Sequence, residues 1–315
     1  MTSPLLQRPG AVAADGVDAG VAAHYGDPFR EQRELDAGNG LVDLSHRPVI
    51  AVSGPDRLSW LHSLTSQHLS ALPPGQWTEA LLLSPQGHVE HHLHLVDDGQ
   101  TVRAVLEPGT AGALVDFLTR MRFLLRVEVD DVTSRWAAVW QAGFDLVPRD
   151  SLAAYDGALA GVQALEALRV AARRPRLGVD TDHRTLPNEV RWLASAVHLD
   201  KGCYRGQEAV ARVYNLGRPP RRLALLHLDG SDSELPTTGA DVLLGERPVG
   251  RVGTVVRHHE LGPIALALVK RNVPDDAALA VDGVAAAIDP AEDDDVPASP
   301  ARASAAARSS LLRHR

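Results

Sequence analysis

The order of strand-like and helix-like stretches is the feature that most restricts the fold of this chain. Residues 40–54 alternate like short strands, and residues 79–108 are typical of a meander of strands joined by tight turns. Helical patterns occupy residues 54–72, 110–123 and 158–174. Because these elements do not alternate as βαβ units, the sequence predicts an α+β fold rather than a doubly wound parallel sheet.

The two ends of the chain differ in composition from the middle. Residues 1–24 are rich in Gly and Ala without periodicity, and we expect a disordered leader. Residues 286–315 combine an acidic run, prolines and then Ala and Ser, which cannot bury enough apolar surface to offset the entropy of ordering, so we expect a disordered tail. Before this tail, residues 240–273 show short strands punctuated by Gly and Pro, a pattern typical of a small barrel.

Charge and cysteine content exclude several classes of function. The net charge of −8 argues against nucleic acid as the main partner, since a phosphate backbone favours a surplus of Lys and Arg. There is no run of about 18 apolar residues and no signal-peptide pattern, so no membrane partner is expected. A single cysteine cannot form an intramolecular disulfide, which suits a reducing compartment. These features together predict a cytoplasmic protein.

The only cysteine lies in the stretch DKGCYRGQEAV, residues 200–210. A cation lowers the pKa of a nearby thiol from about 8.5, and Lys201 could supply that charge to Cys203. Gly202 and Gly206 favour a tight loop, and the alternation after it predicts a strand. The alternative is a cysteine that fills a small apolar hole, which the polar neighbours disfavour. One thiol cannot hold a zinc ion or an iron–sulfur cluster alone, because such sites use about four ligands.

A histidine-rich strand, GHVEHHLHL at residues 87–95, places one set of polar side chains on a single face. Three imidazoles and a carboxylate on that face could bind zinc: His88, Glu90, His92 and His94. Side chains two residues apart on a strand lie about 7 Å apart, however, which is wide for one ion. We therefore expect the solvated side of a half-buried strand and no metal site.

A polar stretch around Pro187 contains a second candidate. Glu189 could hold a ring that bears adjacent N–H donors, because an ionised carboxylate accepts two parallel hydrogen bonds. The residues alone favour a helix N-terminus instead, with Asn188 as its cap.

A short basic cluster surrounds the Pro-Pro turn at residues 219–220. Arg218, Arg221 and Arg222 could hold an anionic tail such as a polyglutamate, and solvated surface arginines are an equally good interpretation.

Taken together, these stretches resemble a known family. DKGCYRGQEAV is similar to the K-G-C-Y-x-G-Q-E signature of the YgfZ family, which is related to the glycine-cleavage aminomethyltransferase (T-protein) and includes mitochondrial iron–sulfur assembly factors. Residues 40–67 resemble the T-protein opening, Gly-Leu-x-Asp-x-Ser-His, and residues 176–190 resemble its pterin-binding Pro-x-Glu segment. Residues 85–95 lie where the T-protein has a Gly-Gly-x-x-Asp-Asp strand. The resemblance covers about residues 25–285.

The resemblance implies a three-domain ring of the T-protein type with a central folate channel. Residues 25–215 would form the folate-binding region of two intertwined α+β domains, and residues 216–285 a small C-terminal β-barrel. The implied function is tetrahydrofolate binding coupled to the assembly or repair of iron–sulfur proteins, which would be the partners of this chain.

The resemblance also assigns roles to individual residues. Lys201 and Cys203 match the signature as its functional pair. Tyr204, Gly206, Gln207 and Glu208 match it as a scaffold. The residues expected to bind the cofactor are Glu189, Glu90, Tyr204 and Arg218.

One departure separates the possible activities. The aminomethyltransferase uses an Asp-Asp pair at positions that here read roughly Glu90 and His91, and it lacks the lysine–cysteine loop. We therefore expect a folate-dependent helper of iron–sulfur proteins, with glycine-cleavage aminomethyltransferase as the alternative. A third hypothesis is a thiol enzyme without folate, in which Cys203 is the nucleophile and His198 or another imidazole the base.

Overall fold

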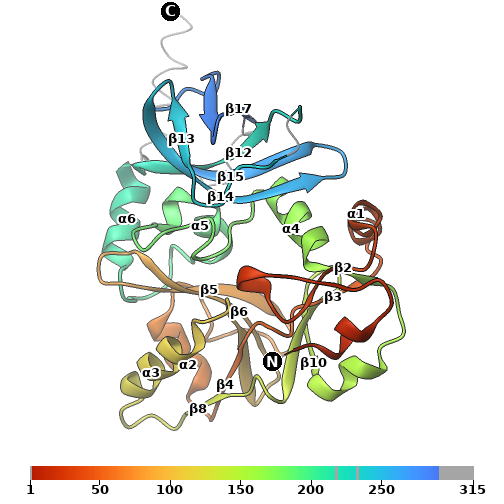
Figure 1. The fold of residues 1–315 in the computed structure, drawn as a ribbon. Coiled ribbons are helices and arrows are strands. Elements are labelled where there is room, and N and C mark those ends of the chain that lie inside the picture. Colours follow the sequence, from red (N-terminus) through yellow and green to blue (C-terminus); the bar gives the residue numbers. More distant parts are fainter. Residues whose placement is uncertain (1, 217–218, 232–233, 291–315) are drawn as a thin grey trace, which may run out of the picture.

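The computed structural model describes residues 2–216, 219–231 and 234–290, which form two larger open sheets, a two-stranded sheet and a barrel (Figure 1). The larger open sheet has the strand order β5-β6-β7-β4-β8 and is antiparallel throughout. Its strands are β4 (Val49–Ser53), β5 (Trp77–Leu83), β6 (Val89–Asp97), β7 (Thr101–Val105) and β8 (Glu128–Asp131). Leucines of α2 (Arg57–Leu64) and α3 (Ala111–Met121) share its apolar core, so these helices cover one face of the sheet.

The smaller sheet has the order β10-β9-β3-β11. Its strands are β3 (Leu41–Asp43), β9 (Trp136–Trp140), β10 (Phe144–Pro148) and β11 (Leu159–Ala160), of which β11 runs parallel to β3. Helices α1 (Pro28–Asp36) and α4 (Val162–Ala171) bury Leu35 and Leu165 in the same core as Val42 of β3. These two helices therefore close the smaller sheet.

The C-terminal part is a closed barrel of order β12-β15-β14-β13-β16-β17, as the sequence predicts. Its strands are β12 (Arg221–Leu228), β13 (Asp241–Leu244), β14 (Arg247–His258), β15 (Gly262–Lys270), β16 (Leu279–Val281) and β17 (Val284–Ile288). Pairing of β12 with both β15 and β17 completes the ring of strands. In Figure 1 the barrel lies above the two open sheets, with α4 beneath it.

An irregular segment joins the larger sheet to the barrel. It contains the turn η4 (Pro187–Glu189) and the helices α5 (Trp192–Ser195) and α6 (Gln207–Leu216). Its apolar side chains form one cluster with residues of β5 and with Leu268 of β15. The segment that carries the cysteine motif is therefore packed against two parts of the molecule at once.

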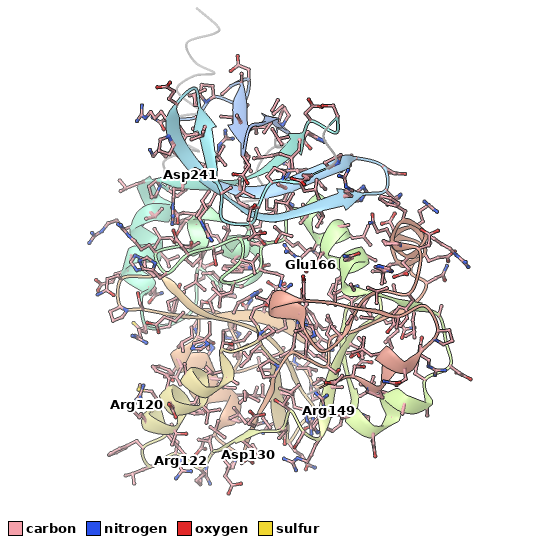
Figure 2. The ribbon with its side chains drawn as sticks, in the orientation of Figure 1. Arg120, Arg122, Asp130, Arg149, Glu166 and Asp241 are labelled. Atoms are coloured by element: carbon pink, nitrogen blue, oxygen red, sulfur yellow. The ribbon has the colours of Figure 1, made fainter. Side chains whose placement is uncertain are left out.

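A buried ion-pair network around Arg176 connects the N-terminal residues, the chain just after β7 and helix α4. Arg176 pairs with Asp18 at 2.9 Å, with Glu107 at 2.8 Å and with Glu166 of α4 at 3.2 Å. Figure 2 shows Glu166 below the barrel. Burial alone would raise the pKa of Glu107, but Arg47 and Arg176 lower it to about 2. Since removing one partner of a buried pair costs about 3–5 kcal/mol, these charges fix the relative positions of the parts.

The structure corrects the expectation of a disordered leader. Residues 2–24 form the turns η1 (Pro4–Gln7) and η2 (Gly16–Asp18) and the paired strands β1 (Val12–Ala13) and β2 (Ala22–His24). Leu5 is packed into the core beside β3 and β9, and Asp18 belongs to the ion-pair network. These elements are too short to show a period in the sequence, and long-range contacts hold them.

Two further boundaries differ from the sequence prediction. The residues after the cysteine loop form helix α6 rather than a strand, and the helix buries Val210. Strand β17 continues to Ile288, so the barrel extends past residue 285. The rest of the expected tail, residues 291–315, lies outside the described residues. None of the described helices combines the length and apolar character needed to cross a membrane. A cytoplasmic location stays a prediction.

Candidate functional site at the cysteine loop

Lys201 points into the protein, where its ammonium holds the end of helix α2. Only 6% of the residue is exposed. Its Nζ donates hydrogen bonds to the carbonyl oxygens of Thr65 at 2.5 Å, Gln67 at 3.1 Å and His62. A cation is favourable at a helix C-terminus, where carbonyl groups lack helical partners. An ammonium has three N–H donors, and these carbonyls take all three. Burial lowers the pKa of Lys201 to about 8.

Tyr204 and Gly206 anchor the other side of the loop. Tyr204 is buried in the apolar cluster that includes Leu81 and Trp192, and burial raises its pKa to about 12. The Lys201 ammonium lies 5.0 Å from the centre of its ring. Gly206 has a φ of 83°, and a Cβ there would lie 2.5 Å from the carbonyl oxygen of Ser84. Tyr204 is thus a packing residue of the loop, and residue 206 must be glycine.

Cys203 lies between these two anchors, and its side chain is exposed. The interpretation of Cys203 as a filler of an apolar hole is therefore wrong. Because Lys201 donates all its N–H groups to backbone carbonyls, it can act on the thiol only through its charge. The structure thus presents the sulfur to solvent on a loop that is fixed on both sides.

Three histidines lie next to the anchored lysine. The ring centroids of His62 and His68 are 4.7 Å apart, and those of His68 and His198 are 5.3 Å apart. Burial and the neighbouring Lys201 charge lower the pKa of His62. The sequence prediction named His198 and missed the other two, which come from the end of α2 and the residues after it.

Glu189 is 3% exposed and already holds a two-donor partner. Arg221 donates from Nε to Oε1 at 2.8 Å and from Nη2 to Oε2 at 2.7 Å. The backbone N–H of Leu186 also donates to Oε2, at 3.0 Å, while Asn188 is not the cap of this turn but donates to the carbonyl of Val210. The carboxylate thus accepts the two parallel hydrogen bonds that are expected of it, and Arg221 supplies both.

The arginines of the basic cluster at residues 218–222 either pair with carboxylates or lie outside the described residues. Arg221 also pairs with Asp182 at 2.6 Å, and Arg222 pairs with Asp275 at 2.5 Å. Arg218 lies outside the described residues. The described arginines of this cluster are thus engaged in internal ion pairs.

Glu90 lies on the surface and contacts the cysteine loop rather than Glu189. Its carboxylate pairs with Arg205 at 2.9 Å, two residues after Cys203. The next residue, His91, is buried on the opposite face of β6, and burial lowers its pKa to about 4. The two positions that correspond to the Asp-Asp pair therefore present one exposed, paired carboxylate and one neutral imidazole.

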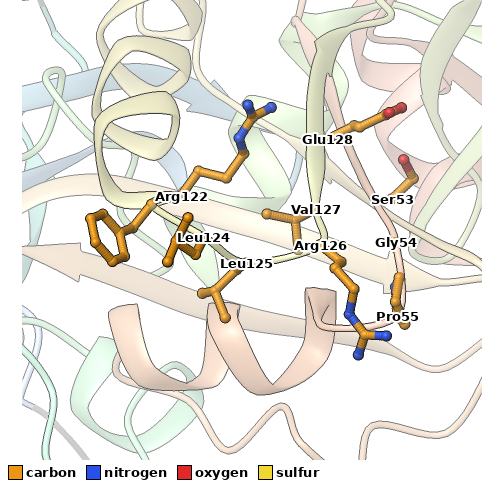
Figure 3. A pocket seen from close by; sticks show the side chains of 10 residues that line it. Ser53, Gly54, Pro55, Arg122, Leu124, Leu125, Arg126, Val127 and Glu128 are labelled. Carbon is orange, nitrogen blue, oxygen red and sulfur yellow. The ribbon is translucent and has the colours of Figure 1, made fainter.

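A pocket of about 560 Å³ lies away from all of these residues. Its lining comes from residues 53–55 and 122–128, at the end of β4 and in the connection from α3 to β8 (Figure 3). Arg126 of this pocket pairs with Asp56 at 2.8 Å. The residues that the sequence analysis predicts as functional do not contribute to its wall.

Comparison with known proteins places this geometry in a wider context. No family model matches the chain. A chloroplastic protein of Arabidopsis thaliana with a provisional transferase assignment is 23% identical over 301 residues, which cover 77% of this chain and 67% of that protein. An aminomethyltransferase of Symbiobacterium thermophilum is 24% identical, over 73% of this chain and 78% of that enzyme.

A solved structure shows the same architecture. The glycine cleavage system aminomethyltransferase T from Bartonella henselae superposes with a TM-score of 0.78, covering 92% of this chain and 97% of that one, at 18% identity. The chain has the aminomethyltransferase fold. This confirms the fold class that the resemblance implies. The relation to aminomethyltransferases is general, and the narrower resemblance to the YgfZ family rests on the motif around Cys203.

Proposed function

We propose that this protein binds a tetrahydrofolate and, through Cys203, acts in the assembly or repair of iron–sulfur proteins. The proposal rests mainly on the structure of the cysteine loop. Lys201 and Tyr204 are buried and fixed, and the thiol between them is exposed. A sulfur on a rigid, accessible loop suits reaction or ligation with a second molecule better than internal packing does.

The partner of the thiol is proposed to be an iron–sulfur client. One thiolate supplies a single ligand, whereas a cluster uses about four, so a cluster bound through Cys203 would be shared with the client's own cysteines. Lys201 is proposed to activate this thiol. The test of that part is the alkylation rate of Cys203 at a fixed pH: Lys201→Met should lower the rate, and an unchanged rate removes the lysine from the proposal.

The folate part of the proposal rests on the fold and on Glu189. The resemblance implies that Glu189 holds a pterin, and its carboxylate already accepts two parallel hydrogen bonds from Arg221. A pterin presents a similar pair of N–H donors. Asp182 is the second partner of Arg221, so the arginine can remain paired when a ligand takes its place at Glu189.

Calorimetry with tetrahydrofolate tests this directly. We expect one site in the wild-type chain and at least a tenfold weaker affinity in Glu189→Gln, which corresponds to about 1.4 kcal/mol. Glu246→Gln, an equal change of charge at an exposed turn of the barrel, is the control. A wild-type chain that binds no tetrahydrofolate would overturn the folate part.

A deletion strain tests the role of the thiol. Activities of cluster-containing enzymes should fall without the gene under oxidative stress and return with the wild-type chain. Cys203→Ser should not restore them at equal protein level, because the hydroxyl cannot replace the thiolate as a ligand or nucleophile. Full rescue by Cys203→Ser contradicts the proposal.

The rival function is the aminomethyltransferase reaction of glycine cleavage, which the named relatives favour. Against it, Glu90 is paired with Arg205 at the surface and His91 is buried. Incubation with aminomethylated carrier protein and tetrahydrofolate distinguishes the two. Formation of methylenetetrahydrofolate would establish the rival, and we expect none. A folate-independent thiol enzyme would instead form covalent adducts at Cys203 that do not respond to folate.

A further inference from the structure

Three side chains of strands β5 and β6 converge at a second polar site. The nearest ligand atoms of Glu79, His92 and His94 all lie within 4.8 Å of one another. We infer that these three residues bind a divalent first-row transition-metal ion. This inference does not depend on the proposed function, because it uses none of the residues of the cysteine loop.

Strand pairing explains why the three side chains meet. Glu79 is directly opposite His94 in the register of β5 and β6, and His92 lies two residues before His94 on the same face. Residues two apart on a strand are about 7 Å apart. Here the two imidazoles lean together, with ring centroids 4.3 Å apart, and Glu79 Oε2 lies 3.1 Å from His92 Nε2. The cross-strand carboxylate supplies the third ligand that the histidine strand lacks.

Aromatic rings from two other parts of the fold fix the imidazoles. Trp192 of α5 lies against His92, with ring centroids 4.6 Å apart, and Phe144 of β10 stacks on His94 at 4.2 Å. The Glu79 side chain is 32% exposed, so an ion can enter from its side. Two ligands are therefore held in place, and the third can rotate to close on an ion.

A hydroxyl group at the end of helix α5 orients the carboxylate of the site. Ser195 Oγ donates a hydrogen bond to Glu79 Oε2 at 2.8 Å and orients it.

The donor set defines the class of ion. Two imidazoles and one carboxylate with an open position are used for catalytic zinc and for non-haem ferrous iron. Bonds of about 2.0–2.2 Å require the ligand atoms to move closer together than they are here, a movement that rotation of the partly exposed Glu79 can supply. In the part of the chain that the structure describes, no other group of His, Cys, Asp and Glu side chains meets this spacing.

Metal titration of the chelator-stripped, full-length protein tests the inference. Zinc is added in competition with a chromophoric chelator, ferrous iron is added anaerobically, and cobalt(II) is used as a spectroscopic probe of the ligand geometry. We expect one ion per chain. Glu79→Gln should weaken zinc binding at least tenfold, and Ser195→Ala should weaken it about tenfold, because such supporting hydrogen bonds are typically worth 10–100-fold.

Two controls separate this site from adventitious binding. Glu246→Gln makes the same change of charge as Glu79→Gln far from the cluster, and His68→Gln removes an exposed imidazole of the other histidine group. Both should leave the affinity unchanged. Because Glu79 is partly exposed, its variant should fold, which circular dichroism checks. Equal affinity in wild type and Glu79→Gln, or loss of binding in His68→Gln, would overturn the inference.

Discussion

The cysteine loop and the β5–β6 strand pair differ in how closeness in sequence relates to contact in the structure. In the loop, Lys201 and Cys203 are two residues apart, yet the lysine is buried at the C-terminal end of helix α2 and the thiol faces solvent. In the strand pair, Glu79 and His94 are distant in sequence, yet cross-strand register sets them opposite each other. The comparison shows that closeness in sequence gives little evidence of contact in a tight loop, whereas strand register brings distant side chains together.

The largest expected effect tests the buried side of the loop. Lys201→Met keeps most of the side-chain volume but leaves the carbonyls of His62, Thr65 and Gln67 without their charged donor. We expect the free energy of unfolding at pH 7 to fall by about 3 kcal/mol, measured by urea denaturation. Lys270→Met is the matched control, because Lys270 donates to a carbonyl at the exposed surface and should change stability by less than about 0.5 kcal/mol. Equal losses in the two variants would show that burial of Lys201 is unimportant.

Metal binding at the β5–β6 strand pair is also measured as a change in the free energy of unfolding. An ion that binds only the folded chain stabilises it by about 2.7 kcal/mol at 100 times its Kd. Zinc should therefore raise the free energy of unfolding of the wild type by that amount at such a concentration and should do much less at the same zinc concentration for Glu79→Gln. Cys203→Ser should respond like the wild type. If the cysteine variant lost the response, the metal would bind at the loop and the comparison would fail.

The pH dependence sharpens the contrast within the loop. The pKa of Lys201 is about 8 in the folded chain and about 10.4 when unfolded, so the unfolded chain binds more protons between these values. Stability contributed at this position should rise with pH from about 8 to 10.5, by at most about 1.4 kcal/mol per pH unit. The measurement is the difference in free energy of unfolding between wild type and Lys201→Met across this range. If the free energies of unfolding of the two proteins changed in parallel across this pH range, the lowered pKa of Lys201 would be contradicted.

The smallest effect is expected at the thiol. Cys203 is exposed, so Cys203→Ser should change the free energy of unfolding by less than about 0.5 kcal/mol while removing alkylation by iodoacetamide. A loss of several kcal/mol would mean that the sulfur is packed, and the loop would then resemble its buried lysine rather than differ from it.

The sequence predicted the barrel because Gly and Pro punctuate residues 240–273 into short strands, of which β13, β14 and β15 pair in chain order. It failed at residues 2–24 and at α6. In the first region, single side chains such as Leu5 and Asp18 contact partners far along the chain. In the second, a short apolar pattern is compatible with both a strand and a helix, and packing of Val210 decides.

By itself the sequence determined the α+β class, the barrel and the position of the one thiol, because periodicity and residue identity are local properties. Only the tertiary structure decided that Lys201 caps α2 and that Arg221 forms an ion pair with Glu189. It also decided that Glu79 lies beside His92 and His94. Each of these contacts joins residues whose separation along the chain carries no signal. Their partners are chosen by strand register and by the need to satisfy buried charges, which exist only once the chain has folded.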